Sequence, residues 1–177
     1  MPAHFEAWCE ALALHGAGGI FKEDVFFAMG GRPTMDIVVE LNDEYNLKLD
    51  PAEVALAKRE AFLKRLGSVV LIDEVAAFAE SLRGKMPLAI ATGGSRMVIE
   101  KTLKVVGVSD WFHEVVTADD VTEGKPSPEI FLKAAQLLGV DPARCLVLED
   151  APAGILAAQR AGMQVVAIPT PLVSSNC

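Results

Sequence analysis

The chain has 177 residues, enough for one ordinary domain or for a core domain with a small second one. Hydrophobic residues make up 51% of the chain and charged residues 23%, which excludes a disordered or collagen-like protein. Sixteen basic residues against 24 acidic ones give a formal net charge of −8, so nucleic acid is not an expected partner. No apolar stretch approaches membrane-spanning length and no export signal is visible, so we expect no membrane association.

Three cysteines, Cys9, Cys145 and Cys177, are widely separated in the sequence. No pair has the spacing of a metal site or of a redox motif. Such a set fits a reducing compartment better than a disulfide framework. We therefore predict a cytoplasmic protein.

Helical patterns fill the first third of the chain. Apolar residues recur at helical spacing from Phe5 to Leu12, and Pro33 begins a second amphipathic segment. Asp50 followed by a proline is a typical helix start, with a capping side chain and a proline in the first turn, and this helix runs to about Arg65. We expect residues 1–66 to form a separate helical cap domain.

From residue 67 onward, short apolar strands alternate with helices. The expected strands cover residues 87–91, 114–117, 145–148 and 164–168, with a helix before the first and helices between the others. Strands of this kind without polar alternation indicate a parallel sheet covered by helices on both faces. The sequence therefore predicts an α/β fold with a Rossmann-like parallel sheet in residues 67–177.

Candidate functional residues directly follow two of these strands, and another candidate lies in a loop. Thr92-Gly-Gly-Ser95 offers a hydroxyl and glycine amides to a phosphate oxygen; the alternative is a plain turn in which Ser95 caps the next helix. Lys125, between a glycine and a proline, could face a phosphate or pair with carboxylates; the alternative is a solvated loop lysine. Glu149 and Asp150 could hold Mg²⁺; the alternative is that Asp150 caps the following helix.

The order and spacing of these groups resemble the haloacid dehalogenase-like superfamily, in particular its β-phosphoglucomutase-like and sugar-phosphate phosphatase branch. The resemblance rests on Thr92-Gly-Gly-Ser, on Gly124-Lys-Pro-Ser-Pro-Glu-Ile-Phe131 and on Leu148-Glu-Asp-Ala-Pro-Ala-Gly154. The opening segment, Pro2 to Trp8, is similar to the place where that branch enters its helical cap. The resemblance covers nearly the whole chain.

This resemblance implies a Mg²⁺-dependent phosphatase that acts on a small phosphorylated metabolite, with a sugar phosphate as the first expectation. The reaction would pass through an aspartyl-phosphate. Small phosphorylated metabolites are therefore the expected partners. The implied site residues are Thr92 and Gly93 for the phosphate, Lys125 for the phosphoryl charge, Asp150 as Mg²⁺ ligand with Glu149 reaching the ion through water, His4 near the leaving group, and Arg32 of the cap loop on the substrate.

The sequence departs from the family pattern at one point. It contains no Asp-x-Asp-Gly-Thr, the motif that supplies the nucleophile, whose usual place is just upstream of Met1. Without the strand that carries this motif, residues 87–92 and 145–149 should face a gap. We expect the chain to be inactive alone and to self-associate through this gap. The alternatives are a phosphomutase, a non-catalytic relative that binds a phosphorylated ligand or a protein, and a shortened chain or mis-assigned start.

Overall fold

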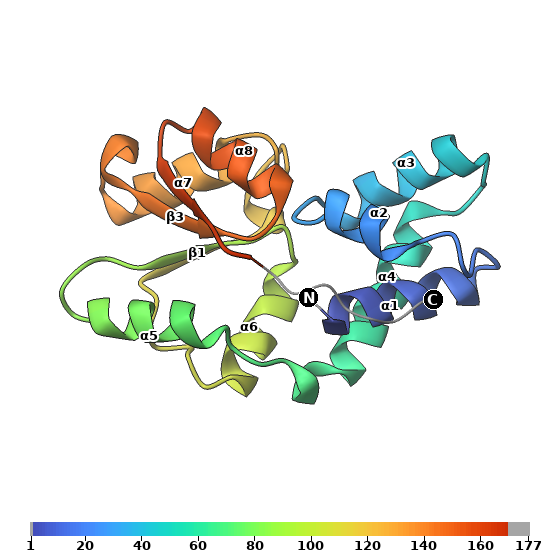
Figure 1. Ribbon diagram of the computed structural model, residues 1–177, viewed down its shortest axis with the longest axis horizontal. Coiled ribbons are helices and arrows are strands. Elements are labelled where there is room, and N and C mark those ends of the chain that lie inside the picture. Colours follow the sequence, from blue (N-terminus) through green and yellow to red (C-terminus); the bar gives the residue numbers. More distant parts are fainter. Residues whose placement is uncertain (1, 170–177) are drawn as a thin grey trace.

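The structure, a computed structural model, describes residues 2–169 and has two parts that lie side by side (Figure 1). One part consists of helices from the first third of the chain. Its elements are α1 (Pro2–Leu14), α2 (Glu23–Ala28), α3 (Thr34–Tyr45), α4 (Pro51–Lys64) and the single turn η1 (Leu66–Ser68). The predicted helices are therefore present, and α2 is an additional short one.

The other part alternates helices with strands, as the sequence predicts. Its helices are α5 (Asp73–Leu82), α6 (Arg96–Val105), α7 (Glu129–Leu138) and α8 (Pro152–Arg160), with short turns η2 (Ala118–Asp120) and η3 (Pro142–Arg144). Its strands are β1 (Ala89–Ala91), β2 (Glu114–Val116), β3 (Leu146–Glu149) and β4 (Gln164–Ala167). All four expected strands are confirmed, each within a few residues of its predicted bounds.

The core of the helical part is rich in aromatic rings. Phe5, Trp8, Phe21 and Phe26 are buried together, and the ring centroids of Trp8 and Phe21 are 5.0 Å apart. Helices α1 and α4 pack along each other and α3 packs on α4. The helical spacing of the apolar residues in α1 places them on one face of the helix, and this face packs against the other helices.

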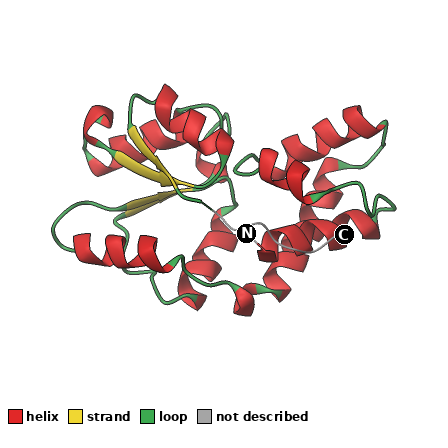
Figure 2. Ribbon diagram, in the orientation of Figure 1, coloured by secondary structure: helices red, strands yellow, loops and turns green. Residues whose placement is uncertain are grey.

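Two separate parallel pairs make up the sheet. Strand β1 pairs with β2, placing Ala89 opposite Glu114, and β3 pairs with β4, placing Leu146 opposite Gln164. Within residues 2–169 no hydrogen-bonded ladder joins β1 to β3. The predicted fold class, parallel strands with helices in an α/β arrangement, is thus confirmed, and the sheet is divided between these two strands (Figure 2).

Helices cover the two faces of the strands unequally. Helix α7 packs on β1 and β2, and α8 on β3 and β4, around a cluster that includes Val116, Val147 and Val165. Helices α5 and α6 lie on the other side of the strands (Figure 1), where α5 buries no residue. On the strands, Leu146 is 48% and Val166 46% exposed. The expected helices are thus present on both faces of the strands, and the cover on the α5 side is the looser one, because α5 buries no residue.

One local expectation comes out differently. Ser95 occupies the N-cap position of α6, but its side chain makes no capping hydrogen bond; Asp119 accepts from the backbone N–H of Arg96 instead, at 2.8 Å. Among the described residues, Cys145 carries a free thiol. Cys177 lies outside the described residues. None of the helices in the described part is long and apolar enough to cross a membrane.

The predicted cap of α4 is confirmed and gives a direct test of the helical part. The Asp50 side chain accepts from the backbone N–H groups of Ala52, at 2.8 Å, and Glu53, at 3.1 Å. Because a lost cap leaves these donors without a protein partner, Asp50→Ala should lower the free energy of unfolding by about 1 kcal/mol in urea titrations. Ser95→Ala is the matched control at a cap position without a capping bond and should change it by less than about 0.5 kcal/mol. Equal losses in the two variants would contradict this account.

Candidate active site

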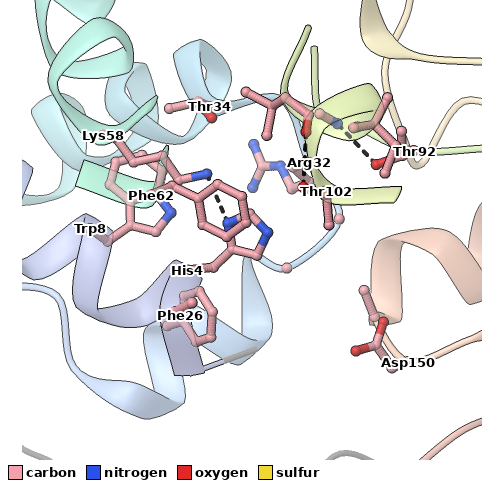
Figure 3. Close-up of a pocket in the computed structure, with 18 of the residues that line it drawn as sticks. His4, Trp8, Phe26, Arg32, Thr34, Lys58, Phe62, Thr92, Thr102 and Asp150 are labelled. Atoms are coloured by element: carbon pink, nitrogen blue, oxygen red, sulfur yellow. Dashed lines mark hydrogen bonds between the residues drawn. The ribbon is translucent and has the colours of Figure 1, made fainter. Parts of the chain in front are cut away.

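A cavity of about 500 Å³ lies where the helical part meets the carboxyl ends of β1 and β3. This edge is where ligands bind in open parallel sheets. The cavity is lined by all seven residues that the sequence singled out: His4, Arg32, Thr92, Gly93, Lys125, Glu149 and Asp150. Figure 3 shows His4 and Arg32 on the helical side and Thr92 and Asp150 on the side of the α/β part.

Lys125 joins the two strands that do not pair. Its side chain is 4% exposed, and Nζ donates to Glu149 Oε2 at 2.6 Å and to the carbonyl oxygen of Ala91 at 3.2 Å. The ammonium also lies 4.8 Å from the centroid of the Phe131 ring. One cation thus connects the end of β1 with the end of β3, and the alternative of a solvated loop lysine is wrong.

Glu149 is fixed from several directions. Its Oε1 accepts from the backbone N–H groups of Asp150, at 3.2 Å, and Ala151, at 3.0 Å, while Oε2 holds Lys125. A Cβ atom on Gly154 would lie only 2.2 Å from the Glu149 carboxyl carbon, so glycine is required there for this carboxylate to fit. Ala151 occupies the N-cap position of α8, so the alternative in which Asp150 caps that helix is wrong.

The donor set for a metal ion is small. Within residues 2–169 no cluster of three or more His, Cys, Asp or Glu side chains could hold a metal. Asp150 lines the cavity, and both oxygens of its neighbour Glu149 are already engaged by hydrogen bonds. Mg²⁺ is usually held by one or two carboxylates together with waters and substrate phosphate oxygens. The carboxylates at the cavity could hold such an ion only together with waters and substrate oxygens, and the role of Asp150 as a ligand stays a prediction.

Thr92 and Gly93 form the turn between β1 and α6. The backbone N–H of Thr92 continues the strand by donating to Val116 at 2.9 Å, and its hydroxyl accepts from Gly94 at 3.2 Å. The turn therefore places a hydroxyl and a glycine backbone at the cavity, close to the N-terminus of α6. The first amide of α6, that of Arg96, already donates to Asp119, so the groups that the turn offers to an anion are the Thr92 hydroxyl and the glycine backbone.

The loop at residues 30–33 lies directly against the loops of the α/β part. A Cβ on Gly93 would be 2.6 Å from the Gly31 carbonyl oxygen, and one on Gly124 would be 2.2 Å from the Pro33 ring. Gly31 has a φ of +80°, and its own Cβ would meet that of Ala151 at 3.0 Å. Only glycine permits these approaches, so backbone contact closes this side of the cavity.

Arg32, in the same loop, forms a salt bridge with Glu40 of α3. Its guanidinium points into the centre of the cavity in Figure 3. The pairing to Glu40 holds the side chain in place and offsets its charge. Its expected role in substrate binding stays a prediction.

The sequence analysis missed Lys58, which lines the cavity beside His4. Its Nζ is 3.3 Å from His4 Nδ1 and 5.7 Å from the centroid of the Trp8 ring, and His4 stacks on Phe62 with ring centroids 4.0 Å apart. Burial lowers the pKa of Lys58 to about 8. Burial, and next the Lys58 charge, hold the pKa of His4 well below 6.5, so this imidazole is neutral at pH 7.

A signal for Lys58 was nevertheless present in the sequence. Val54, Ala61 and Phe62 are the buried residues of α4, and Lys58 stands four residues from both Val54 and Phe62. Residues four apart share a helix face. A lysine within an apolar stripe is a candidate for a buried or functional cation.

A family model for haloacid dehalogenase-like hydrolases matches residues 1–162. The chain belongs to this family. It is 37% identical to the fructose-1-phosphate phosphatase YqaB of Escherichia coli over 172 residues, which cover 93% of this chain and 87% of the relative. It is 34% identical to hexitol phosphatase A of E. coli, over 92% of this chain and 68% of that protein.

Solved structures support the fold of this hydrolase independently. The β-phosphoglucomutase of Clostridium difficile superposes with a TM-score of 0.79 at 23% identity, over 96% of this chain and 78% of that one. The sequence-based recognition of the superfamily and of its branch is thus confirmed. The roles of the individual site residues, and the division of the chain at residue 66, stay predictions.

The Lys125–Glu149 pair can be tested by a double-mutant cycle. Because removing one partner leaves a buried charge uncompensated, Lys125→Met should lower the free energy of unfolding by about 3–5 kcal/mol. The double variant Lys125→Met/Glu149→Gln should recover much of this loss. Urea unfolding followed by circular dichroism gives the free energy of unfolding of the unmodified protein, of the two single variants and of the double variant. Additive losses would show that the two side chains do not interact energetically.

The glycine contacts predict a second effect. In Gly124→Ala the new methyl group would collide with Pro33, so the loop at residues 30–33 should shift away and its amides should exchange faster with deuterium. The cost in unfolding free energy should be about 1–3 kcal/mol, the usual range for overpacking. Gly67→Ala is the matched control, because its Cβ meets no atom within 4 Å and its backbone is not left-handed. If Gly124→Ala leaves exchange at residues 30–34 unchanged, the contact does not hold the loop.

Proposed function

We propose that this hydrolase removes phosphate from a small sugar or polyol monophosphate. The observation that carries the proposal is the buried Lys125 at the ends of β1 and β3, in the same cavity as the Thr92–Gly93 turn and Asp150. A fixed cation in the same cavity as a hydroxyl and the glycine backbone of a strand-to-helix turn is suited to the charge of a phosphoryl group. The fructose-1-phosphate and hexitol phosphatases among its relatives support sugar and polyol phosphates as the substrate class.

Mg²⁺ is the proposed cofactor, held by Asp150 with Glu149 in its outer sphere. When bound, the ion would supply positive charge to the phosphate oxygens. The chain's own residues bind and orient the phosphate: Lys125 offsets charge on the phosphoryl group and the Thr92 hydroxyl donates to one of its oxygens. On the other side of the cavity, His4 and Arg32 face the sugar portion.

The described residues do not supply an obvious nucleophile. Among those lining the cavity, the carboxylates are Glu149, which pairs with Lys125, and Asp150, the proposed metal ligand. At the same place β1 and β3 each have one unpaired edge. We propose that the 177-residue chain is inactive alone, that a strand carrying Asp-x-Asp-Gly-Thr completes both sheet and site, and that the unpaired edges make the chain self-associate.

A complementation experiment tests this proposal. The 177-residue chain with Mg²⁺ and fructose 1-phosphate should release phosphate only at the background rate. A synthetic peptide with an apolar strand followed by Asp-x-Asp-Gly-Thr should raise the melting temperature, convert associated chains to monomers in sedimentation, and produce Mg²⁺-dependent phosphate release. The control peptide, with Asn in place of the first Asp, should bind equally well but give no release.

Two results would contradict the proposal in different ways. Metal-dependent turnover by the chain without peptide, abolished in Asp150→Ala, would show that the nucleophile lies within it. If the peptide leaves melting temperature and association unchanged, the edges of β1 and β3 do not accept a strand.

A cytoplasmic location stays a prediction from the sequence.

A further inference from the structure

Asp120 connects two segments at the carboxyl edge of the strands. Its Oδ2 atom accepts from the backbone N–H of Thr117, at 2.8 Å, from the Thr117 hydroxyl, at 2.7 Å, and from Arg96 Nη2, at 2.6 Å. Thr117 begins the loop that leads to Lys125. Arg96 is the first residue of α6 and directly follows the turn at residues 92–95. A single carboxylate oxygen thus joins the turn and the loop that are proposed to hold one phosphate.

Further contacts hold the turn against the same loop. The backbone N–H of Ala118 donates to the carbonyl oxygen of Gly94 at 3.1 Å, and the Asp119 carboxylate accepts from the backbone N–H of Arg96 at 2.8 Å. The Ser95 side chain makes no capping hydrogen bond within the described part of the chain. The start of α6 is therefore held by the loop and not by the serine of its own turn.

The other end of this loop is anchored on α7. The carboxylate of Glu129, in the first turn of that helix, accepts from the backbone N–H of Thr122, at 2.9 Å, and from that of Glu123, at 2.8 Å. These two amides lie directly before Gly124 and Lys125. Because α7 fixes the loop in this way, the contacts of residues 118–120 set where the start of α6 lies relative to Lys125.

The Asp120 carboxylate carries its charge at neutral pH. Hydrogen bonds from Thr117, and next the Arg96 guanidinium, hold the pKa of Asp120 below its usual value. Glu100 also pairs with Arg96, but at 3.9 Å and with its side chain 62% exposed. The shorter, charge-assisted bond to Asp120 is therefore the one that holds the guanidinium. Neither Asp120 nor Arg96 lines the cavity, so any effect of this pair on a ligand is indirect.

We propose that Asp120 is a positioning residue for phosphate binding. Through Arg96 it holds the turn at residues 92–95 at the distance from Lys125 at which one phosphate contacts both. Because binding groups must be held close to their productive places, a small shift of the turn costs affinity even though Asp120 does not touch the ligand. This inference rests on the proposed function, which assigns the turn and Lys125 to the same phosphate.

Inorganic phosphate is the probe. The protein, labelled with ¹⁵N, is titrated with phosphate at constant pH and ionic strength, and the amide signals of Gly93 and Gly94, which line the cavity, report binding in nuclear magnetic resonance spectra. Asp120→Ala should raise the dissociation constant about tenfold, because the turn and Lys125 no longer meet the phosphate together. Asp120→Asn keeps an oxygen at this position and should raise the dissociation constant by less than about threefold.

Two matched variants separate positioning from a general loss of stability. Asp141 accepts from the backbone N–H of Ala143 in the turn η3, which precedes β3 at the opposite edge of the strands. Asp141→Ala should therefore lower the melting temperature without changing the affinity for phosphate. Glu100→Gln removes the more distant carboxylate beside Arg96 and should also leave the affinity unchanged. An affinity loss in Asp141→Ala as large as that in Asp120→Ala would overturn the proposal.

A double-mutant cycle tests the path through Arg96. Arg96→Met should weaken phosphate binding about as much as Asp120→Ala, and the double variant should bind no more weakly than either single variant, because both changes break the same contact. If Asp120→Ala does not fold, Arg96→Met carries the test by itself. Additive losses, or an unchanged affinity in either folded single variant, would overturn the proposal.

The unmodified protein separates this proposal from the proposed function. If phosphate shifts the signals of Gly93 and Gly94 in the unmodified protein and Asp120→Ala binds equally well, the phosphate site stands and only the positioning role of Asp120 fails. If phosphate shifts neither signal in the unmodified protein, the phosphate site itself fails, and the positioning role fails with it.

Discussion

The site depends on one buried cation that bridges two strands which do not pair with each other. Lys125 reaches the last carbonyl of β1 and the carboxylate at the end of β3. Burying an ammonium is costly unless it is paired and hydrogen-bonded, and here both conditions are met. The Glu149 carboxylate is in turn held by two backbone amides and by the space that Gly154 leaves. The ion pair with Lys125, the two backbone amides and the absence of a side chain at Gly154 therefore fix the position of the Glu149 carboxylate.

The parallel topology of the strands explains which features of the site could be predicted from the sequence. Thr92, Lys125 and Asp150 each follow a strand or lie in a loop at the carboxyl edge, and parallel topology brings such positions together. Each motif alone had a simple structural alternative; the solvated lysine and the Asp150 cap were excluded only by burial and by the position of Ala151. Order and spacing were more informative than any single residue.

What the sequence could not predict depends on contacts between distant segments. Lys58 and His4 are far apart in the chain and meet because α1 and α4 pack along each other. The approach of Gly31 to Gly93 is likewise a property of the assembled molecule. That α5 buries no residue is likewise a property of the assembled molecule and does not follow from its sequence pattern.

The divided sheet also has a consequence for how the chain folds. In each pair, the two strands are joined through one intervening helix, α6 between β1 and β2 and α8 between β3 and β4. The paired residues are 25 positions apart in the first unit (Ala89 and Glu114) and 18 in the second (Leu146 and Gln164), and the entropy lost in closing a loop rises only slowly with such lengths. Because no ladder joins the two units in the described part of the chain, their association depends on side-chain and loop contacts, among which Lys125 bonds to Ala91 of one unit and to Glu149 of the other.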